Sequence, residues 1–446
     1  MKKRAARIAQ PRSKAARTVA HQAVPMPVLQ IEKPVYGGAF LARAEGKAVF
    51  VPLALPGEQV RLRIVEEKRG YATAEVEQVV VPAKERIAPK CQHFGACGGC
   101  HYQHTDDAAQ LAFKQAILRE TLQRGGVPVP REISVLAAKP WRYRNRIRAA
   151  FDIGGYAGYR ERRSHALIRI AECPIAAPLL VRAAKAAGEL LRDLPPHLRP
   201  SEISLFCDAQ ETALLASLVA SHHGTRWFDE FAQKFGQQVP ATKGIELAVD
   251  GGRGKAPRRA AQWGTDFLFY RAAEFDYRVD QSAFFQVNRW LVDALVDCVT
   301  GWRGGGVAWD LFAGVGLFAR QLASGFESVI AVEPAEAAAA ALQQNLSNTG
   351  GTVVKAATLD FLRSPQRGKR PDLIVVDPPR SGLGAETTAL LGQIAAPELV
   401  YVSCDPATLA RDLRALIGAG YSVQNVTLAD LFPQTFHLET VTRLRR

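Results

Sequence analysis

The residue best placed for covalent chemistry is Cys404, in the segment Ser403-Cys404-Asp405-Pro406. The apolar run Leu399–Val402 predicts a buried strand, and Asp405 followed by Pro406 is typical of a helix start, with the aspartate as N-cap. A thiol at a helix N-terminus feels the partial positive charge of free N–H groups, so the pKa of Cys404 is expected to be lowered. These features favour a nucleophile over an inert core cysteine.

A second group of residues predicts a nucleotide-like cofactor. The strand Val307–Phe312 runs into a turn containing Gly314 and Gly316, and the next strand, Ser328–Val332, ends at Glu333. Glycines let the backbone approach a ligand, and an acid at this place accepts hydrogen bonds from ribose hydroxyls. This pattern fits a dehydrogenase as well as a methyltransferase.

The third strand, Leu373–Val376, ends in Asp377-Pro378-Pro379-Arg380 instead of leading into a second nucleotide-binding half. Two prolines stiffen a loop beyond the sheet edge and can shape a slot for a planar base. We prefer this interpretation to a simple strand terminator, and it favours a methyltransferase.

A thiol beside a methyl donor suits one reaction in particular. Carbon 5 of uracil is a poor nucleophile until a thiolate adds to carbon 6, and a general base must afterwards remove the carbon 5 proton. The segment Phe436-His437-Leu438-Glu439 offers Glu439 as that base, with His437 as the rival.

The formal net charge of +14 is concentrated in two segments. Residues 1–20 carry seven Lys or Arg and no acid, and residues 131–170 carry ten against three acids, so each contributes +7. In the run Trp141–Arg148, strand alternation would place four arginines on one face beside aromatic rings, which suits RNA phosphates and stacked bases. A solvated charged face is the alternative.

The elements that must position these residues fall into successive units. A basic, disordered arm is expected over 1–29, and alternating short strands over 30–82 predict a five-stranded, oligonucleotide-binding type of barrel. A mixed α+β central domain, 83–280, carries the cysteines and the RNA-binding face, and its helix at 104–124 is a candidate to pack on the catalytic domain. Residues 281–446 alternate strands and helices as a doubly wound parallel sheet does.

The chain resembles the bacterial RNA 5-methyluridine methyltransferases, and within them the iron–sulfur members that act on 23S ribosomal RNA. The similarity covers nearly the whole chain from about residue 30. The motifs that carry it are Cys91–Cys100, Phe284–Asn288, Asp310–Gly316, Asp377–Arg380, Ser403–Pro406 and Phe432–Glu439.

The resemblance implies a TRAM barrel, a central α+β RNA-binding domain and a class I Rossmann-like catalytic domain that binds S-adenosylmethionine. It implies that Cys404 attacks carbon 6 and that Glu439 takes the carbon 5 proton. Leu317 departs from the family, which often has a polar residue there. The implied cofactor-binding residues are Gln286, Phe312, Gly314, Leu317, Glu333, Asp360 and Asp377.

The resemblance also implies that Cys91, Cys97, Cys100 and Cys173 bind a 4Fe-4S cluster. Without the family, the spacing describes only a tetrathiolate site that zinc fits equally well. Seven cysteines, an odd number, together with the absence of a secretory signal, argue against a disulfide framework, and Cys207 and Cys298 are expected in the core.

The expected function is methylation of a uridine in 23S ribosomal RNA by a cytoplasmic monomer without membrane or DNA partners. Transfer RNA is the alternative substrate. A purine amino-methyltransferase is one rival, although it has no use for Cys404, and a non-enzymatic iron–sulfur RNA-binding protein is another. Because a base within a helix hides its ring faces, the target is expected to be single-stranded or flipped out.

Overall fold

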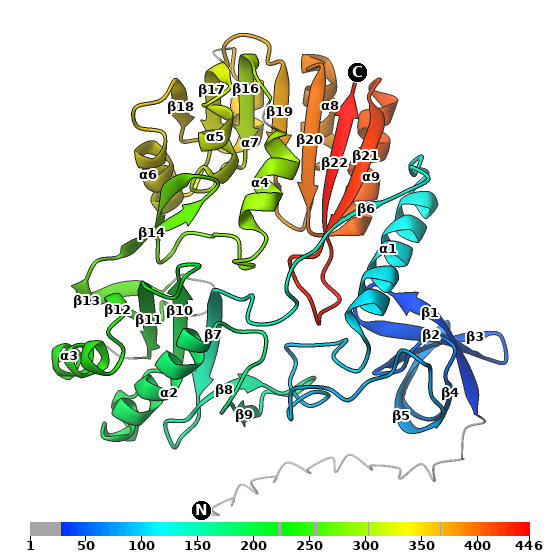
Figure 1. Ribbon diagram of the computed structural model, residues 1–446, viewed down its shortest axis with the longest axis vertical. Coiled ribbons are helices and arrows are strands. Elements are labelled where there is room, and N and C mark those ends of the chain that lie inside the picture. Colours follow the sequence, from blue (N-terminus) through cyan, green and yellow to red (C-terminus); the bar gives the residue numbers. More distant parts are fainter. Residues whose placement is uncertain (1–27, 222–224, 253–256, 302, 366) are drawn as a thin grey trace, which may run out of the picture.

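The protein consists of a small barrel, a central sheet and a larger catalytic sheet (Figure 1). The computed structural model describes residues 28–221, 225–252, 257–301, 303–365 and 367–446. The basic arm expected over residues 1–29 lies almost entirely outside the described residues.

The barrel is closed and five-stranded, as predicted, with the strand order β1-β2-β3-β5-β4. Its interior is filled by the alternate apolar residues of each strand, among them Phe40, Val51 and Leu62, because successive strand residues point to opposite faces. The strands are β1 (Leu29–Val35), β2 (Ala39–Ala44), β3 (Lys47–Pro52), β4 (Gln59–Glu67) and β5 (Tyr71–Val81).

The central domain is a mixed sheet of seven strands in the order β13-β12-β11-β10-β7-β8-β9. Two helices, α2 (Pro178–Arg192) and α3 (Phe228–Gln238), cover one face with the apolar residues of a shared core that includes Cys207. The strands are β7 (Arg146–Phe151), β8 (Ala157–Arg160), β9 (Leu167–Arg169), β10 (Glu202–Cys207), β11 (Leu214–Ala220), β12 (Thr242–Val249) and β13 (Arg258–Gly264).

The predicted single row of arginines in this domain is wrong. Strand β7 begins only at Arg146, whose guanidinium group lies 4.3 Å from the centre of the Phe206 ring. Arg148 pairs with Glu202 on the neighbouring strand. The two arginines before the strand line two different cavities. Contacts with β10 of the same sheet therefore occupy Arg146 and Arg148, so the four arginines do not form one free cationic row.

The catalytic sheet has eight strands in the order β18-β17-β16-β19-β20-β22-β21-β6. All four apolar runs predicted as strands are present and parallel. They are β16 (Gly305–Leu311), β17 (Phe326–Val332), β19 (Leu373–Val376) and β20 (Glu398–Ser403), and the others are β18 (Gly351–Val354), β21 (Ser422–Ala429), β22 (Glu439–Arg445) and β6 (Ser134–Leu136).

Helices cover both faces of this sheet over two separate apolar cores, and Cys298 packs against one of them. One face carries α4 (Val292–Thr300), α5 (Leu317–Leu322) and α6 (Glu336–Asn345). The other carries α1 (Asp107–Arg124), α7 (Thr358–Arg363), α8 (Gly384–Ile394) and α9 (Pro406–Gly418). The chain reaches α4 through a hairpin, β14 (Phe267–Ala272) and β15 (Phe275–Asp280), which packs on α6.

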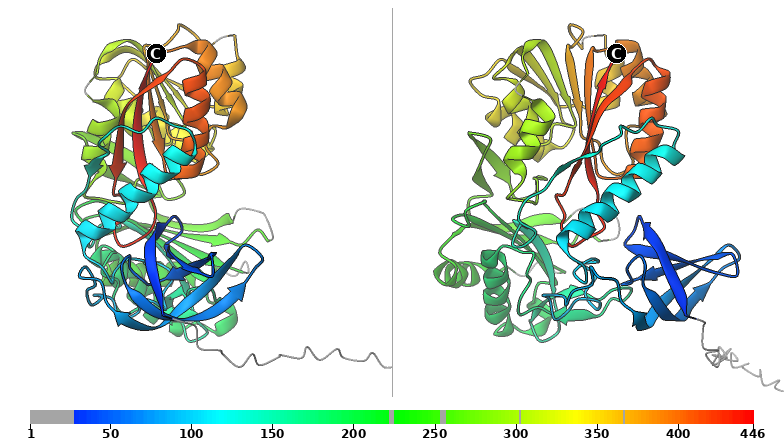
Figure 2. Two further views of the ribbon diagram at one scale, coloured as in Figure 1. Left: turned by 90° about the vertical axis from the view of Figure 1, so that its right-hand side faces the viewer. Right: turned by 45° about the vertical axis from the view of Figure 1, so that its right-hand side comes forward.

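Residues 107–136 pack on the catalytic domain, which the sequence analysis considered for the helix within 104–124 but not for the strand that follows it. Helix α1 lies against α9, and β6 is the edge strand of the catalytic sheet, parallel to β21. The carboxyl ends of the parallel strands face the barrel and the central domain (Figures 1 and 2). Within the described residues, no helix is both long and apolar enough to span a bilayer.

Candidate active site

Cys404 lies between the end of β20 and the start of α9, as predicted. The side chain of Asp405 caps the helix by accepting hydrogen bonds from the backbone N–H groups of Ala407 and Thr408, at 3.0 and 2.9 Å. Pro406 is the first residue of the helix. The thiol is therefore held at the carboxyl edge of the sheet, and it is half-buried.

Glu439 reaches the same edge because β22 is antiparallel to β20. Ser403, the last residue of β20, is the register partner of Thr440, whose hydroxyl donates to the Ser403 carbonyl oxygen at 3.1 Å. The first residue of β22 is therefore next to Cys404, although the two are far apart in sequence. Glu439 is buried, with 7% of its surface exposed.

The charges at this edge act on one another, which places Cys404, Glu439 and Asp377 in one site. Burial, followed by the carboxylates of Glu439 and Asp377, raises the pKa of Cys404 to about 11. The expectation of a lowered pKa is therefore wrong, because burial and two carboxylates outweigh the helix N-terminus. Burial raises the pKa of Asp377 to about 7, and burial together with Asp377 raises the pKa of Glu439 well above its usual range.

Arg380, at the end of the Asp-Pro-Pro-Arg segment, is the opposing charge. It lowers the pKa of both Cys404 and Glu439, although in each case less than burial raises it. Its side chain is exposed, and the described part of the chain offers it no ion pair. The site thus combines a thiol, two carboxyls and a cation at three adjacent strand ends.

The two strands further along the sheet form the predicted cofactor edge. Phe312, directly after β16, has a φ of 70°, which is strained for a residue with a side chain. The Glu333 carboxylate accepts hydrogen bonds from the N–H groups of Gly314, at 2.9 Å, and Ala335, at 2.8 Å. It thereby ties together the two turns, and each oxygen keeps a lone pair for a ligand hydroxyl.

The remaining predicted cofactor residues differ in their surroundings. Gln286 is 8% exposed, and its backbone oxygen accepts a hydrogen bond from Asn145 at 3.0 Å. Leu317 packs in the core at the start of α5 with 6% exposure, so its side chain has no polar role. Asp360 lies in the first turn of α7, and its side chain is 71% exposed beside Arg363.

His437, the rival base, is half-buried and packs against the ring of Phe436, with the ring centres 4.4 Å apart. Burial, with Arg380 next, lowers the pKa of His437 to about 4. Its imidazole is therefore neutral at physiological pH and a weak base, whereas Glu439 has a raised pKa. The electrostatics favour Glu439.

A barrel residue that the sequence did not single out also lies at the nucleophile. The hydroxyl of Tyr36, in the turn between β1 and β2, donates to the backbone oxygen of Cys404 at 3.4 Å. Its ring meets Phe436 edge-on at 5.6 Å between centres. The turn needs Gly38, because φ is +85° and a Cβ atom there would lie 2.9 Å from the His101 ring. Such a contact between distant segments leaves no periodic signal in the sequence.

The loop between β21 and β22, which delivers Glu439, is held by helix α1 and by the central domain. Lys114 of α1 is fully buried and pairs with Asp430 at 2.6 Å. Gln434, 1% exposed, exchanges side-chain and backbone hydrogen bonds with Gln110 at 3.0 and 2.9 Å. The Tyr143 hydroxyl of the central domain donates to the Pro433 oxygen at 3.1 Å. The position of the predicted base is therefore set by α1 and the central domain, together with Tyr36 of the barrel, whose ring contacts Phe436 in the same loop.

The four cysteines predicted as cluster ligands line one pocket of about 200 Å³. Burial raises the pKa of the Cys100 thiol to about 12, and the other three thiols add to that shift. No described set of three or more Cys, His, Asp or Glu is close enough together to hold a metal ion.

Comparisons with known proteins agree with this architecture. Residues 369–446 match the tRNA (Uracil-5-)-methyltransferase family, and residues 28–76 match the TRAM domain. The 23S rRNA (uracil(1939)-C(5))-methyltransferase RlmD of Halomonas elongata is 34% identical over 93% of this chain and 89% of that protein. RlmD of Azoarcus is 33% identical over 94% of this chain and 100% of that protein.

A solved structure shares the fold. The tRNA (uracil-54, C5)-methyltransferase of Pyrococcus abyssi, in complex with S-adenosyl-L-homocysteine, superposes with a TM-score of 0.75 and 23% identity. The match covers 94% of this chain and 99% of that one. The arrangement of barrel, central domain and catalytic sheet is therefore a known one.

Proposed function

This chain belongs to the family of S-adenosylmethionine-dependent RNA uracil-5-methyltransferases, and from that premise we propose that it methylates one uridine of 23S ribosomal RNA through a covalent adduct with Cys404. The observation that supports the mechanism is geometric: Cys404 follows the last residue of β20 and Glu439 is the first residue of its antiparallel neighbour β22, with Ser403 and Thr440 in register. A purine amino-methyltransferase has no use for a thiol at this place.

The first step is addition of the Cys404 sulfur to carbon 6 of the uracil. The thiol loses its proton to solvent, a carbon–sulfur bond forms, and the electron pair of the 5,6 double bond moves toward the carbon 4 oxygen. Carbon 5 then becomes nucleophilic. When bound, S-adenosylmethionine supplies the methyl group that carbon 5 accepts.

The second step restores the base. Glu439, in its carboxylate form, takes the proton from carbon 5, the 5,6 double bond forms again, and the carbon–sulfur bond breaks to release Cys404. Burial makes Glu439 a stronger base than an exposed glutamate, because it destabilises the carboxylate. Cys404 and Glu439 both act in their deprotonated forms, and both have raised pKa values. We therefore expect the rate to increase from neutral toward alkaline pH.

Arg380 favours both reactive forms, because it lowers the pKa of Cys404 and of Glu439. Gln286, Phe312, Gly314, Glu333 and Asp377 are the residues we assign to the methyl donor, with Glu333 as the acceptor for its ribose hydroxyls. We keep Asp360 as a weaker candidate, because its side chain is largely exposed. Leu317 contributes packing alone.

The choice of 23S ribosomal RNA rests on the RlmD relatives, and transfer RNA is the alternative. The test is mass mapping of 5-methyluridine in ribosomal and transfer RNA from cells with and without the gene. Loss of one 5-methyluridine from 23S RNA is expected. Loss from transfer RNA alone would transfer the assignment to that substrate.

Cys91, Cys97, Cys100 and Cys173 are proposed to hold a 4Fe-4S cluster. Thiolates are the usual ligands of such clusters, and these four thiols face one pocket. The group would tie the segment before α1 to the segment before α2, which is a structural role. Iron and sulfide analysis of protein purified without oxygen is the test, with Cys173→Ser as the variant expected to lose iron. If the protein contains one equivalent of zinc and no iron, the four thiolates hold a zinc ion in place of the cluster.

A further inference from the structure

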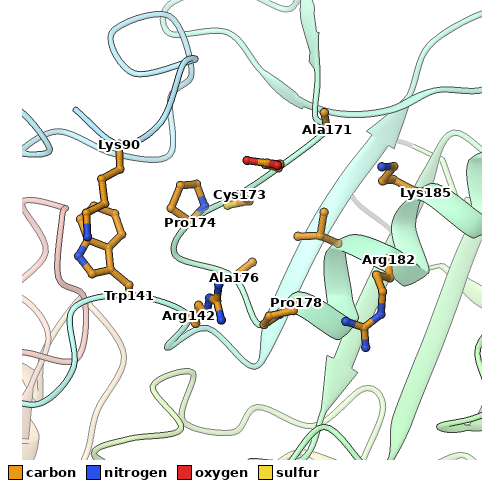
Figure 3. A pocket seen from close by; sticks show the side chains of 12 residues that line it. Lys90, Trp141, Arg142, Ala171, Cys173, Pro174, Ala176, Pro178, Arg182 and Lys185 are labelled. Atoms are coloured by element: carbon orange, nitrogen blue, oxygen red, sulfur yellow. The ribbon is translucent and has the colours of Figure 1, made fainter. Parts of the chain in front are cut away.

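A second cavity adjoins the cysteine pocket, and Glu172, Cys173 and Pro174 line both. Its volume is about 510 Å³, which is within the range of small-molecule sites. Figure 3 shows it between Trp141 on one side and helix α2 on the other, with Pro174 and Pro178 among the residues along it. Its lining includes none of Cys404, Glu439 and Asp377, so it is separate from the candidate active site.

The cavity is lined by apolar and cationic residues. Four cations line it, Lys90, Arg142, Arg182 and Lys185, against the single acid Glu172. In the described parts of the chain none of these four is paired with a carboxylate.

Other arginines of the same domain are neutralised. Arg169 pairs with Asp152 at 2.7 Å, Arg289 with Glu211 at 2.8 Å, and Arg148 with Glu202. A cavity that keeps an excess of positive charge while its surroundings are neutralised is complementary to an anion.

The aromatic wall of the cavity is suited to a planar group. Trp141 is half-exposed, and the Lys90 ammonium group lies 4.5 Å from its ring centre. The backbone of Arg142 is clamped, with its N–H donating to Pro174 at 2.9 Å and its oxygen accepting from Arg289 at 2.8 Å. Its φ of 54° is rare for a residue with a side chain. Strain of this kind is concentrated at ligand sites.

We propose that this cavity binds one unpaired nucleotide of the RNA substrate, at a position other than the methylated uridine. Its base would stack on Trp141, and the phosphates on either side would face Arg142, Arg182 and Lys185. The proposal deepens the proposed function, on which it rests for the identity of the ligand as RNA. Stacking on an aromatic ring beside a cationic groove is how proteins bind single-stranded nucleic acid.

The cavity is also connected to the catalytic edge. Tyr143, two residues after Trp141, donates to Pro433 in the loop that delivers Glu439. The Trp141 backbone oxygen accepts from the Trp290 ring N–H at 3.1 Å, directly before α4. A nucleotide held here therefore fixes the distance along the RNA at which the target uridine meets Cys404, which makes the cavity a determinant of site selection.

The test measures the affinity of the full-length holoprotein for a 23S RNA fragment containing the target, over a series of salt concentrations. Trp141→Ala is expected to weaken binding by about 5- to 150-fold, the range that stacking of one base supplies. Trp141→Phe, which keeps a stacking ring, is expected to retain most of the affinity.

The double variant Arg182→Ala/Lys185→Ala is expected to reduce the salt dependence, lowering the slope of log K against log salt by about 1.4 for two lost phosphate contacts. Arg414→Ala, which removes an exposed cation of α9 outside this cavity, is the matched control and is expected to bind normally. Affinity for S-adenosylmethionine reports that each variant is folded.

Wild-type affinity and slope in the cavity variants would overturn the inference. So would an equal loss in Arg414→Ala, because it would indicate diffuse attraction without a defined site. The proposed function is tested separately in the same preparations by methylation of the fragment. A wild-type protein that binds through the cavity but methylates no uridine would refute that function and leave the cavity assignment standing.

Discussion

The reactivity of Cys404 toward an alkylating agent distinguishes two opposed expectations. The helix N-terminus alone predicts a lowered pKa, whereas burial and the carboxylates of Glu439 and Asp377 raise it to about 11. Only the thiolate reacts with iodoacetamide. At pH 8 a thiol with its usual pKa of 9.0 is about a tenth ionised, and one at about 11 is about a thousandth ionised, so Cys404 should react about a hundredfold more slowly.

The assay follows carbamidomethylation of the Cys404 peptide by mass spectrometry in the free enzyme between pH 7 and pH 10. The rate should rise about tenfold per pH unit without reaching a plateau. Glu439→Gln removes the second-largest cause of the raised pKa, so its profile should move to lower pH and its reaction at pH 9 should be faster than that of the wild-type protein.

The matched control is Glu336→Gln, an acid of α6 whose side chain is 87% exposed, and it should leave the profile unchanged. A plateau below pH 9 in the wild-type protein would refute the reasoning. It would mean that the dipole of α9 dominates over burial and the two carboxylates.

Three further predictions concern the residues around the nucleophile. Tyr36→Phe removes the hydrogen bond to the Cys404 oxygen and should lower kcat by about 2- to 13-fold in a protein that still unfolds cooperatively; an unchanged kcat would exclude this positioning role. Arg380→Gln should raise the pKa of Cys404 and Glu439 and so move the pH–rate profile for kcat/KM to higher pH, and a shift to lower pH would contradict the assignment. Lys114→Met leaves the Asp430 carboxylate buried and unpaired. Urea denaturation should therefore show a loss of about 3–5 kcal/mol in the free energy of unfolding. A loss below about 1 kcal/mol would show that water reaches the pair.

The sequence predicted the local features of the catalytic domain well. Each parallel strand is a continuous apolar run because both its faces are buried, and this signal needs no knowledge of distant residues. The Asp405 cap and Pro406 are likewise local, since both act within one helical turn. The position of Cys404 could therefore be predicted from the sequence.

Features that depend on distant segments could not be predicted in this way. The pKa of Cys404 is raised by burial and then by Glu439 and Asp377, which reach it through the sheet topology, while sequence reasoning considered only the adjacent helix. Lys114 looked like an ordinary polar helix residue, but it is buried against Asp430, 316 positions later. Tyr36 reaches Cys404 only because the barrel packs on the catalytic loop.

The most direct test of the mechanism is whether Cys404 forms a bond to the substrate. Glu439→Gln protein, incubated with S-adenosylmethionine and the 23S RNA fragment, should accumulate an adduct that survives a denaturing gel, and digestion should place the methylated uridine on the Cys404 peptide. The double variant with Cys404→Ala should form none. An adduct on another residue, or turnover by Cys404→Ala at the wild-type rate, would contradict the mechanism.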